Sequence, residues 1–316
     1  MRNSLHGIHH ITAISSDPQA NFDFYTRLLG LRMVKQTINY DDPSVYHLYF
    51  GDRVGSPGSI LTFFPFPDAQ AGKVGNGQVG AIGYSISADS IEFWVERFSR
   101  LGISFDGPFK RFDHEVISFK DSDGLPLELI ADSNRSGVYW TESSLPSAHA
   151  IKRFSSTTLL LNNADPTSSL ITDVLGFEMV ATEGNRTRFA AGTGEDRQLV
   201  DIVANPEARR GVPGPGTVHH IAWRCLDADQ EEWRKAVEAN GYNVTPIIDR
   251  NYFHSIYFRE KGGILFEVAT DEPGFAVDQT ESELGSRLSL PPWLESRRED
   301  IIRQLPPLTT IGQQVS

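Results

Sequence analysis

Residues 7–15 read GIHHITAIS and place two adjacent histidines, His9 and His10, at the start of an apolar, β-branched run. Such a run predicts a strand. Because successive side chains of a strand point to opposite faces, a regular strand would bury only one of the two. A second doublet, His219 and His220, holds the same place in the run TVHHIAW. The two doublets are therefore either core residues or two halves of one metal site.

One pattern of elements recurs four times along the chain: an alternating strand, a helix and three more strands, the last usually opened by glycine. In the first copy the helix DPQANFDFYTRLLG has Asp17 as its cap, Pro18 in its first turn and Gly30 at its end. The pattern predicts an α+β fold in which pairs of βαβββ units form two curved, open-barrel sheets. The four units are expected at residues 1–67, 77–133, 150–205 and 216–272.

The connecting segments agree with this division. Residues 66–77 and 205–216 are rich in glycine and proline and are expected to be linkers, while the polar, serine-rich stretch 133–149 crosses the middle of the chain. Residues 273–316 form a tail with one short helix expected at Trp293–Gln304. Its apolar residues predict that the tail packs on the body of the protein or on a second subunit in a homodimer.

Composition limits the class of protein. With 316 residues and 39% hydrophobic residues the chain can bury a sizeable core, and its single cysteine, Cys225, excludes an intramolecular disulfide framework. No leader sequence or long apolar run is visible, so we expect a cytoplasmic protein without a membrane partner. The 29 basic and 41 acidic residues give a net charge of −12, which argues against nucleic acid as a partner.

Alignment of the four units shows which side chains should occupy equivalent places. The doublet position in the first strand is held in turn by His9-His10, Gly80-Ala81, Ser155-Ser156 and His219-His220. The equivalent position in the fourth strand is held by Thr62, Glu128, Asp201 and Glu267. Histidines therefore occupy the doublet position only in units one and four.

If units one and four share a barrel, its inner wall carries His10, His220 and Glu267, with Thr62 in the remaining place. Two imidazoles and one carboxylate on one face of a metal leave the other coordination positions open. This is the arrangement associated with non-haem Fe(II) that binds both an organic substrate and O₂. A fourth acidic or amide ligand would instead favour a closed octahedral site for isomerisation, and a threonine at position 62 argues against it.

The competing arrangement pairs neighbouring units, because adjacent units most often pack together. It would leave His10 with Glu128 in one barrel, and His220 with Asp201 and Glu267 in the other. Only the pairing of unit one with unit four uses both doublets, so we favour it. Units two and three then form a second barrel with a vacant site, in which Glu128 is held by structural hydrogen bonds.

The fourth unit carries further candidates in DRNYFHSIYFRE, which contains Arg250, His254 and Tyr257. A buried tyrosine near a metal can donate to a bound oxyanion, and an arginine can stabilise developing negative charge. A core aromatic residue or a surface ion pair explains these residues equally well. The apolar residues of this unit are expected in the core rather than in a substrate pocket: Trp223, Phe253 and Phe266.

Taken together, these residues resemble the vicinal oxygen chelate superfamily, which includes glyoxalase I, fosfomycin and bleomycin resistance proteins and extradiol dioxygenases. More narrowly, four stretches resemble hydroquinone and chlorohydroquinone 1,2-dioxygenases, which cleave aromatic rings: GIHHITAIS, GTVHHIAW, YFHSIYFREKGGILFEVATDEPGF and LPPWLESRR. The resemblance covers nearly the whole chain. Ser155-Ser156 replaces the histidine that catechol-cleaving relatives carry in the third unit.

The resemblance implies a small aromatic substrate, O₂ as co-substrate and Fe(II), or alternatively Mn or Zn, held by His10, His220 and Glu267. It also implies supporting roles beside the metal for five residues: His9, Thr12, His219, Arg250 and Tyr257. Two other functions stay open. One is a glyoxalase-type isomerase or thiol transferase using Zn²⁺, Ni²⁺ or Mn²⁺, and the other is a metal-free, drug-binding module.

Overall fold

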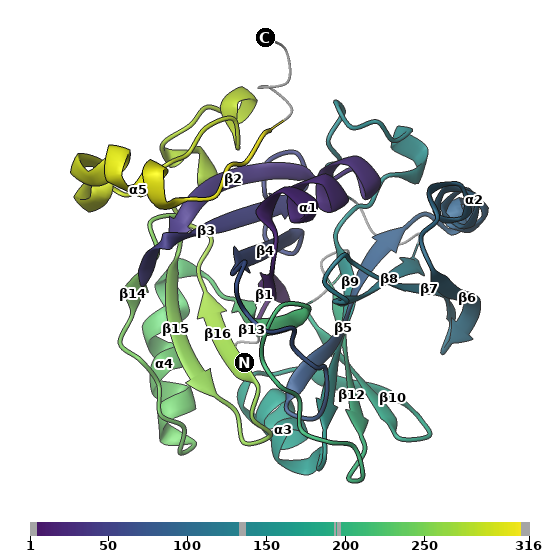
Figure 1. The fold of residues 1–316 in the computed structure, drawn as a ribbon. Coiled ribbons are helices and arrows are strands. Elements are labelled where there is room, and N and C mark those ends of the chain that lie inside the picture. Colours follow the sequence, from purple (N-terminus) through teal and green to yellow (C-terminus); the bar gives the residue numbers. More distant parts are fainter. Residues whose placement is uncertain (1–4, 133–136, 193, 195–196, 311–316) are drawn as a thin grey trace.

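Two curved eight-stranded sheets make up most of the structure, a computed structural model that describes residues 5–132, 137–192, 194 and 197–310 (Figure 1). The first sheet has the order β14-β15-β16-β13-β1-β4-β3-β2 and the second the order β10-β11-β12-β9-β5-β8-β7-β6. The first sheet thus joins the strands of units one and four, and the second joins those of units two and three. The predicted pairing is confirmed. The first four residues of unit one, residues 133–136 of the crossing segment and the last six of the tail lie outside the described part.

The strands of the first sheet are β1 (Ile8–Ser15), β2 (Arg32–Asn39), β3 (Asp42–Gly51), β4 (Ile60–Pro65), β13 (Thr217–Arg224), β14 (Ile248–Asp249), β15 (His254–Arg259) and β16 (Leu265–Ala269). Those of the second are β5 (Gln78–Ile86), β6 (Phe105–Arg111), β7 (His114–Lys120), β8 (Pro126–Ala131), β9 (Phe154–Leu161), β10 (Glu178–Glu183), β11 (Arg186–Ala191) and β12 (Gln198–Ala204). The α-helices are α1 (Pro18–Asp23), α2 (Ile91–Leu101), α3 (Asp165–Ser169), α4 (Gln230–Ala239) and α5 (Arg298–Gln304). Short 3₁₀ turns lie at Ala88–Ser90, Ser147–His149, Asp227–Asp229, Phe275–Val277, Glu281–Glu283 and Pro292–Arg297.

The antiparallel pair β1–β13 joins the two halves of the first sheet, and each strand carries a β-bulge at its histidine doublet. Ile8 lies opposite Trp223 and His10 opposite Ala222, so His9 is an extra residue in β1. In β13 the extra residue is His219, between His220 and Val218. A bulge sets two residues against one on the partner strand and redirects a side chain. His9 and His10 are both buried, in a strand that is covered on both faces, and their Nδ1 atoms are in contact.

The second sheet repeats this irregularity. In the β5–β9 pair the register shifts between Val79 and Ala81 and again between Gly83 and Tyr84. The extra residues are Gly80 in β5 and Ser155 in β9, which are the first members of the doublet position in units two and three. The bulge therefore belongs to the repeated unit, and histidine occupies it only in the first sheet.

The first helix begins as predicted, since the Asp17 carboxylate accepts a hydrogen bond from the Ala20 amide at 2.7 Å. Its second half differs from the expected single α-helix. After Asp23 the chain continues as a π-helical turn, Phe24–Leu28, closed by the Leu29 amide bonding the Phe24 carbonyl. Unit three repeats this, with α3 followed by a π-helical turn at Leu170–Val174. The apolar pattern alone does not distinguish the two helix types, because it records only which residues face the core.

The tail packs on the body of the protein, where it lies beside β2 and β3 (Figure 1). Lys35 of β2 anchors it: its buried ammonium group donates to the Phe275 carbonyl at 3.1 Å, the Gln279 side chain at 2.7 Å and the Asp278 carboxylate. The expected helix is a 3₁₀ turn followed by α5. Trp293 packs its ring against Tyr40, 5.8 Å away between centroids.

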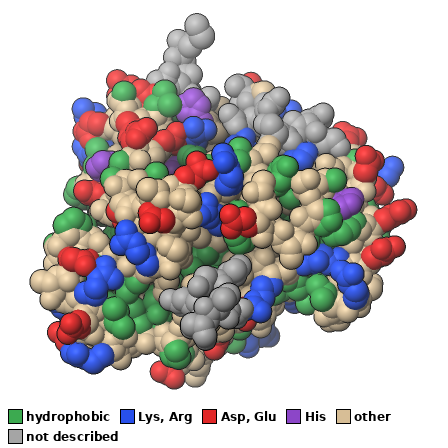
Figure 2. Space-filling view, turned by 90° about the horizontal axis from the view of Figure 1, so that it is seen from above, with side chains coloured by type: hydrophobic (Ala, Val, Ile, Leu, Met, Phe, Trp, Pro, Cys, Tyr) green, Lys and Arg blue, Asp and Glu red, His purple; other side chains and the backbone are tan. Residues whose placement is uncertain are grey.

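The surface carries side chains of both charge signs, interspersed over the face seen in Figure 2. No helix in the described ranges is long and apolar enough to cross a membrane. The two linkers lie against each other. Isolated backbone β-bridges pair Lys73 with Val212 and Asn76 with Arg210.

Replacing Lys35 by Met tests the anchor of the tail. Loss of the buried ammonium group removes its hydrogen bonds to the Phe275 carbonyl and the Gln279 side chain and its ion pair with Asp278, so we expect the free energy of unfolding to fall by about 1–3 kcal/mol. Arg53 supplies the control, because it holds the same tail through an exposed ion pair with Glu281 at 2.7 Å. Replacing Arg53 by Gln should cost less than about 1 kcal/mol. Urea unfolding of both variants measures the difference, and equal losses would contradict the anchor.

Candidate metal centre

Three side chains from three adjacent strands converge inside the first sheet: His10 of β1, His220 of β13 and Glu267 of β16. The Glu267 Oε2 atom lies 2.9 Å from Nε2 of His220 and 3.3 Å from Nε2 of His10. The two Nε2 atoms are 3.3 Å apart. All three residues are buried. The structure therefore brings together two strands from opposite ends of the sequence at a His-His-Glu site.

The spacing of these donor atoms fits a divalent metal ion. Bonds of about 2.1 Å at right angles place neighbouring donor atoms about 3.0 Å apart, close to the separations found. The Glu267 Oε2 atom is buried and lies against the Nε2 atoms of both histidines. A buried carboxylate needs a compensating charge, and a cation bound between the three donors would supply it.

The first histidine of each doublet contacts the second. Nδ1 of His9 lies 2.9 Å from Nδ1 of His10, and Nδ1 of His219 lies 2.8 Å from Nδ1 of His220. In each pair one ring donates and the other accepts. A hydrogen bond at Nδ1 fixes the orientation of an imidazole whose Nε2 binds metal. His9 and His219 are thus placed to orient His10 and His220.

The protonation states of the site suit metal binding. Burial lowers the pKa of His220 below its ordinary value, lowers that of His9 well below it, and lowers the pKa of His219 to about 4. Burial tends to raise the pKa of Glu267, but the attraction of His10 and His220 outweighs it and holds this pKa well below the ordinary value. Near neutral pH, His220 is therefore neutral and Glu267 ionised, which are the forms that bind a metal.

Arg250 and Tyr257 flank the triad. Tyr257 lies opposite Glu267 on β15, and its hydroxyl accepts a hydrogen bond from Arg250 Nε at 3.1 Å. Arg250 also forms an ion pair, at 3.4 Å, with Asp41, which lies between β2 and β3. Burial raises the pKa of Tyr257. Tyr257 therefore remains a protonated phenol that can donate to an oxyanion.

A cavity of about 550 Å³ opens beside the triad. Besides His10 and His220 it is lined by Ile14, Asn39, Tyr40, Asp41, His47, Tyr49, Phe64, Phe66, His219, Arg250, Phe253, Tyr257 and Leu265. Phe253, expected only in the core, contacts both rings of the first doublet and faces the cavity. Trp223 and Phe266 are core residues as expected. His254, the remaining candidate of this motif, is not among the lining residues.

Two residues beside the site, His47 and Ser255, were missed from the sequence. They hold equivalent positions in the third strands of units one and four. His47 lies two residues before Tyr49, the cross-strand partner of Thr62, and Ser255 lies two residues before Tyr257, the cross-strand partner of Glu267. Ser255 donates to Oε1 of Glu267, and Nε2 of His47 lies 2.8 Å from Oγ1 of Thr62. In unit three Arg186 holds Asp201 from the same place. A comparison of the third strands of the units could have found both residues, because polar side chains recur at this position.

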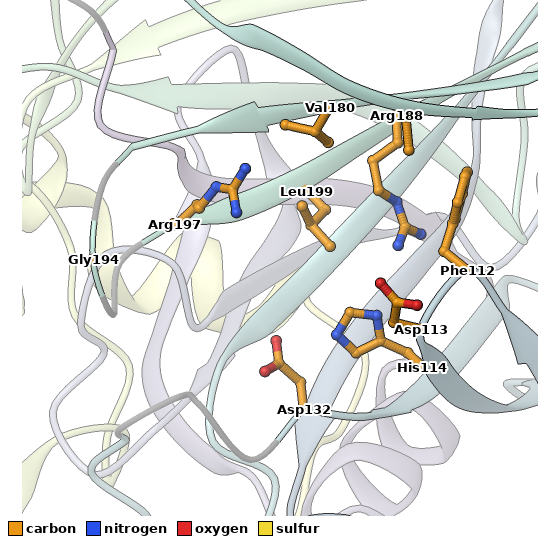
Figure 3. Close-up of a pocket in the computed structure, with 10 residues that line it drawn as sticks. Phe112, Asp113, His114, Asp132, Val180, Arg188, Gly194, Arg197 and Leu199 are labelled. Carbon is orange, nitrogen blue, oxygen red and sulfur yellow. The ribbon is translucent and has the colours of Figure 1, made fainter.

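The second sheet has a related cavity, of about 510 Å³, drawn in Figure 3. Two of its lining residues match residues of the first cavity. Arg188 lies opposite Asp201 as Tyr257 lies opposite Glu267, and Leu199 precedes Asp201 by two residues as Leu265 precedes Glu267. In this sheet the buried carboxylate is paired with arginine: Asp201 accepts hydrogen bonds from Arg186 and Arg188.

Glu128 of the second sheet has a similar partner. Both of its oxygens accept hydrogen bonds from Arg111, at 2.6 and 2.8 Å. Within the described ranges, the only group of His, Cys, Asp and Glu side chains with metal spacing is the triad of the first sheet. At the positions where the first sheet has its metal-type site, the second sheet therefore has ion pairs between arginine and carboxylate side chains.

The fold and this site define the class of protein: the chain belongs to the glyoxalase/bleomycin resistance protein/dioxygenase superfamily, whose sequence profile matches residues 7–129 and 153–268. It is 44% identical over 302 residues to a Bacillus subtilis protein named "Putative ring-cleaving dioxygenase MhqO", covering 95% of this chain and 96% of the relative. It is 33% identical over 310 residues to the chlorohydroquinone/hydroquinone 1,2-dioxygenase of Sphingobium indicum, covering 95% and 96%.

Solved structures agree. A crystal structure titled as a putative dioxygenase from Bacillus subtilis superposes with a TM-score of 0.94 at 43% identity, covering 98% of this chain and 99% of that one. Glyoxalase I from Zea mays superposes with a TM-score of 0.63 at 13% identity, covering 84% of this chain and 92% of that one. The second likeness shows the fold alone. The first agrees with the sequence relatives, which are named as ring-cleaving dioxygenases.

Replacing Glu267 by Gln tests the site through metal binding. We expect the wild-type chain to bind one divalent ion and the variant to lose at least about tenfold in affinity, because an amide oxygen is a much weaker ligand. Glu128→Gln is the matched control, since Glu128 holds the equivalent place in the second sheet. It should bind metal like the wild type. Calorimetric titration with Mn²⁺ without oxygen measures both, and equal affinities would contradict the site.

Proposed function

We propose that this protein is an Fe(II)-dependent, extradiol-type dioxygenase that opens a hydroquinone-type ring, substituted or chlorinated, with O₂. The observation that carries this proposal is the buried triad of His10, His220 and Glu267 beside a cavity with aromatic walls. The identity to a chlorohydroquinone/hydroquinone 1,2-dioxygenase supports the choice of substrate class.

When bound, Fe(II) supplies coordination positions for both a substrate hydroxyl and O₂ and lets electron density pass between them. The protein itself binds and orients the substrate and limits the access of water. Phe64, Phe66 and Phe253 give the cavity apolar walls suited to an aromatic ring and limit the access of water. Binding the ring in one orientation removes much of the entropic cost of the reaction.

His219 is the best placed proton acceptor. It lines the cavity, and its ring contacts His220 and Phe64. It can take the proton of a substrate hydroxyl and return a proton later. His9 does not line the cavity and is more suited to orient His10. Tyr257 and Arg250 would donate to negative charge on the substrate's oxygen.

The two alternative functions have weaker support. A glyoxalase-type isomerase is expected to use a fourth protein ligand, but the fourth place is held by Thr62, whose hydroxyl is bonded to Thr12 and His47. A metal-free binding module needs an apolar groove and no triad. Its function does not explain why a buried carboxylate and two buried imidazoles lie at metal-ligand spacing.

Anaerobic reconstitution with Fe(II), followed by measurement of oxygen uptake with substituted hydroquinones and catechols, tests the proposal. We expect uptake with hydroquinones that depends on bound iron, near wild-type uptake in Glu128→Gln and at least about a hundredfold less in Glu267→Gln. Activity without oxygen in a Zn- or Ni-loaded protein would support the isomerase. A lack of metal binding and of uptake would leave the binding module.

Replacing Thr62 by Glu tests the open character of the site. A carboxylate in the fourth place should convert the three-ligand set into a four-ligand set, so we expect affinity for Ni²⁺ to rise about tenfold or more and oxygen uptake to be lost. Thr62→Val is the control for loss of the hydroxyl and should leave metal affinity unchanged. Metal titration and the oxygen electrode report both properties. A Thr62→Glu protein with unchanged affinity would show that position 62 does not face the metal.

A further inference from the structure

A chain of hydrogen bonds runs from the third strand of unit one to β1, beside the triad. The Tyr49 hydroxyl lies 2.8 Å from Nδ1 of His47, and Nε2 of His47 lies 2.8 Å from Oγ1 of Thr62. Thr62 in turn donates to Oγ1 of Thr12 at 2.8 Å. The chain thus links three neighbouring strands of the first sheet, β3, β4 and β1.

Its inner end lies next to the metal ligands. Thr12 follows His10 by two residues with no bulge between them, so their side chains share one face of β1. Thr12 is also the partner of His220 in the register of β1 and β13. The outer end, His47, lines the cavity.

The direction of the chain follows from the donors available. Burial raises the pKa of Tyr49 well above its ordinary value and lowers that of His47 well below it, so Tyr49 keeps its proton and His47 is neutral. A neutral imidazole has one donor and one acceptor nitrogen. Tyr49 then donates to Nδ1 of His47, and Nε2–H of His47 donates to Thr62. Since the Thr62 oxygen accepts from His47, its own proton goes to Thr12.

This order of donors leaves a specific role for the last hydroxyl. The Thr12 oxygen already accepts from Thr62, so the Thr12 proton must be donated elsewhere. A buried hydroxyl proton without an acceptor is costly, and the face of β1 that Thr12 shares with His10 is the face of the triad.

We propose that His47 is a positioning residue that, through Thr62, turns the Thr12 hydroxyl into a hydrogen-bond donor toward the metal centre. The inference deepens the proposed function and rests on it. In the other sheet the equivalent places of Thr62 carry Glu128, bonded to Arg111, and Asp201, bonded to Arg186, which also donates to Thr158. In unit three an arginine thus donates from the place of His47, whereas beside the triad the same position carries an imidazole that can both accept and donate.

The first test reads the direction of the chain without any reaction. In metal-free full-length protein labelled with ¹⁵N-histidine, we expect His47 at neutral pH to be neutral, with Nε2 protonated and Nδ1 bare. The missing signal in His47→Gln identifies it. Protonation at Nδ1 alone would overturn the proposal, because Nε2 would then be an acceptor and Thr62 would be free to donate to His47 rather than to Thr12.

The second test reads the effect on turnover. His47→Phe keeps the packing against Phe64 but removes both nitrogens, so we expect kcat with a hydroquinone to fall about tenfold or more while KM and iron content change by less than about threefold. His47→Gln, which can still accept and donate, should restore most of the rate. Tyr49→Phe removes only the outer end and should have an effect of less than about threefold.

A double-mutant cycle separates the chain from general damage. Because His47, Thr62 and Thr12 act in series, His47→Phe combined with Thr62→Val should lower kcat no further than either change alone. Additive losses, an unchanged kcat in His47→Phe, or a loss of iron in that variant would overturn the proposal. Wild-type protein that takes up no oxygen with any hydroquinone would overturn the proposed function, whereas the labelled protein reports the chain separately.

Discussion

The bulge at each histidine doublet is the constraint on which the metal-type site depends. A regular antiparallel pair would send His9 and His10 to opposite faces, and likewise His219 and His220. The extra residue in each strand instead lets the first ring lie against the second, Nδ1 to Nδ1. The donor atoms that face Glu267 are therefore fixed by backbone geometry. Since the bulge recurs at Gly80 and Ser155, this backbone geometry does not depend on histidine.

Charge compensation distinguishes the two sheets. The second sheet carries a buried carboxylate in each of its fourth strands, Glu128 and Asp201, and the first carries one, Glu267; a buried carboxylate must be paired. In the second sheet Arg111, Arg186 and Arg188 do this through direct hydrogen bonds. In the first, the neighbours of Glu267 are the imidazoles of His10 and His220 and the Ser255 hydroxyl. The same position is thus paired with arginine in the second sheet and with two metal-type ligands in the first.

Much of this arrangement could be predicted from the sequence. The βαβββ repeat, the pairing of unit one with unit four and the convergence of His10, His220 and Glu267 followed from comparing first and fourth strands, because equivalent places in a repeat are equivalent in space. The bulges could not be predicted, since an apolar alternation does not record an extra residue. The π-helical turns were hidden for a similar reason. His47 and Ser255 were missed because a single polar residue in a strand is ordinary until its cross-strand neighbour is known.

The closure of the first sheet by β1 and β13 also has a consequence for how the protein is made. His10 and His220 are 210 residues apart, and Glu267 follows later still. During synthesis β1 must wait for β13, while the second sheet is built from consecutive units and can form as soon as unit three has emerged. Contacts of such long range form slowly. The sheet without the triad can thus form before the His-His-Glu site is complete, and the three donors come together only after β16 has been made.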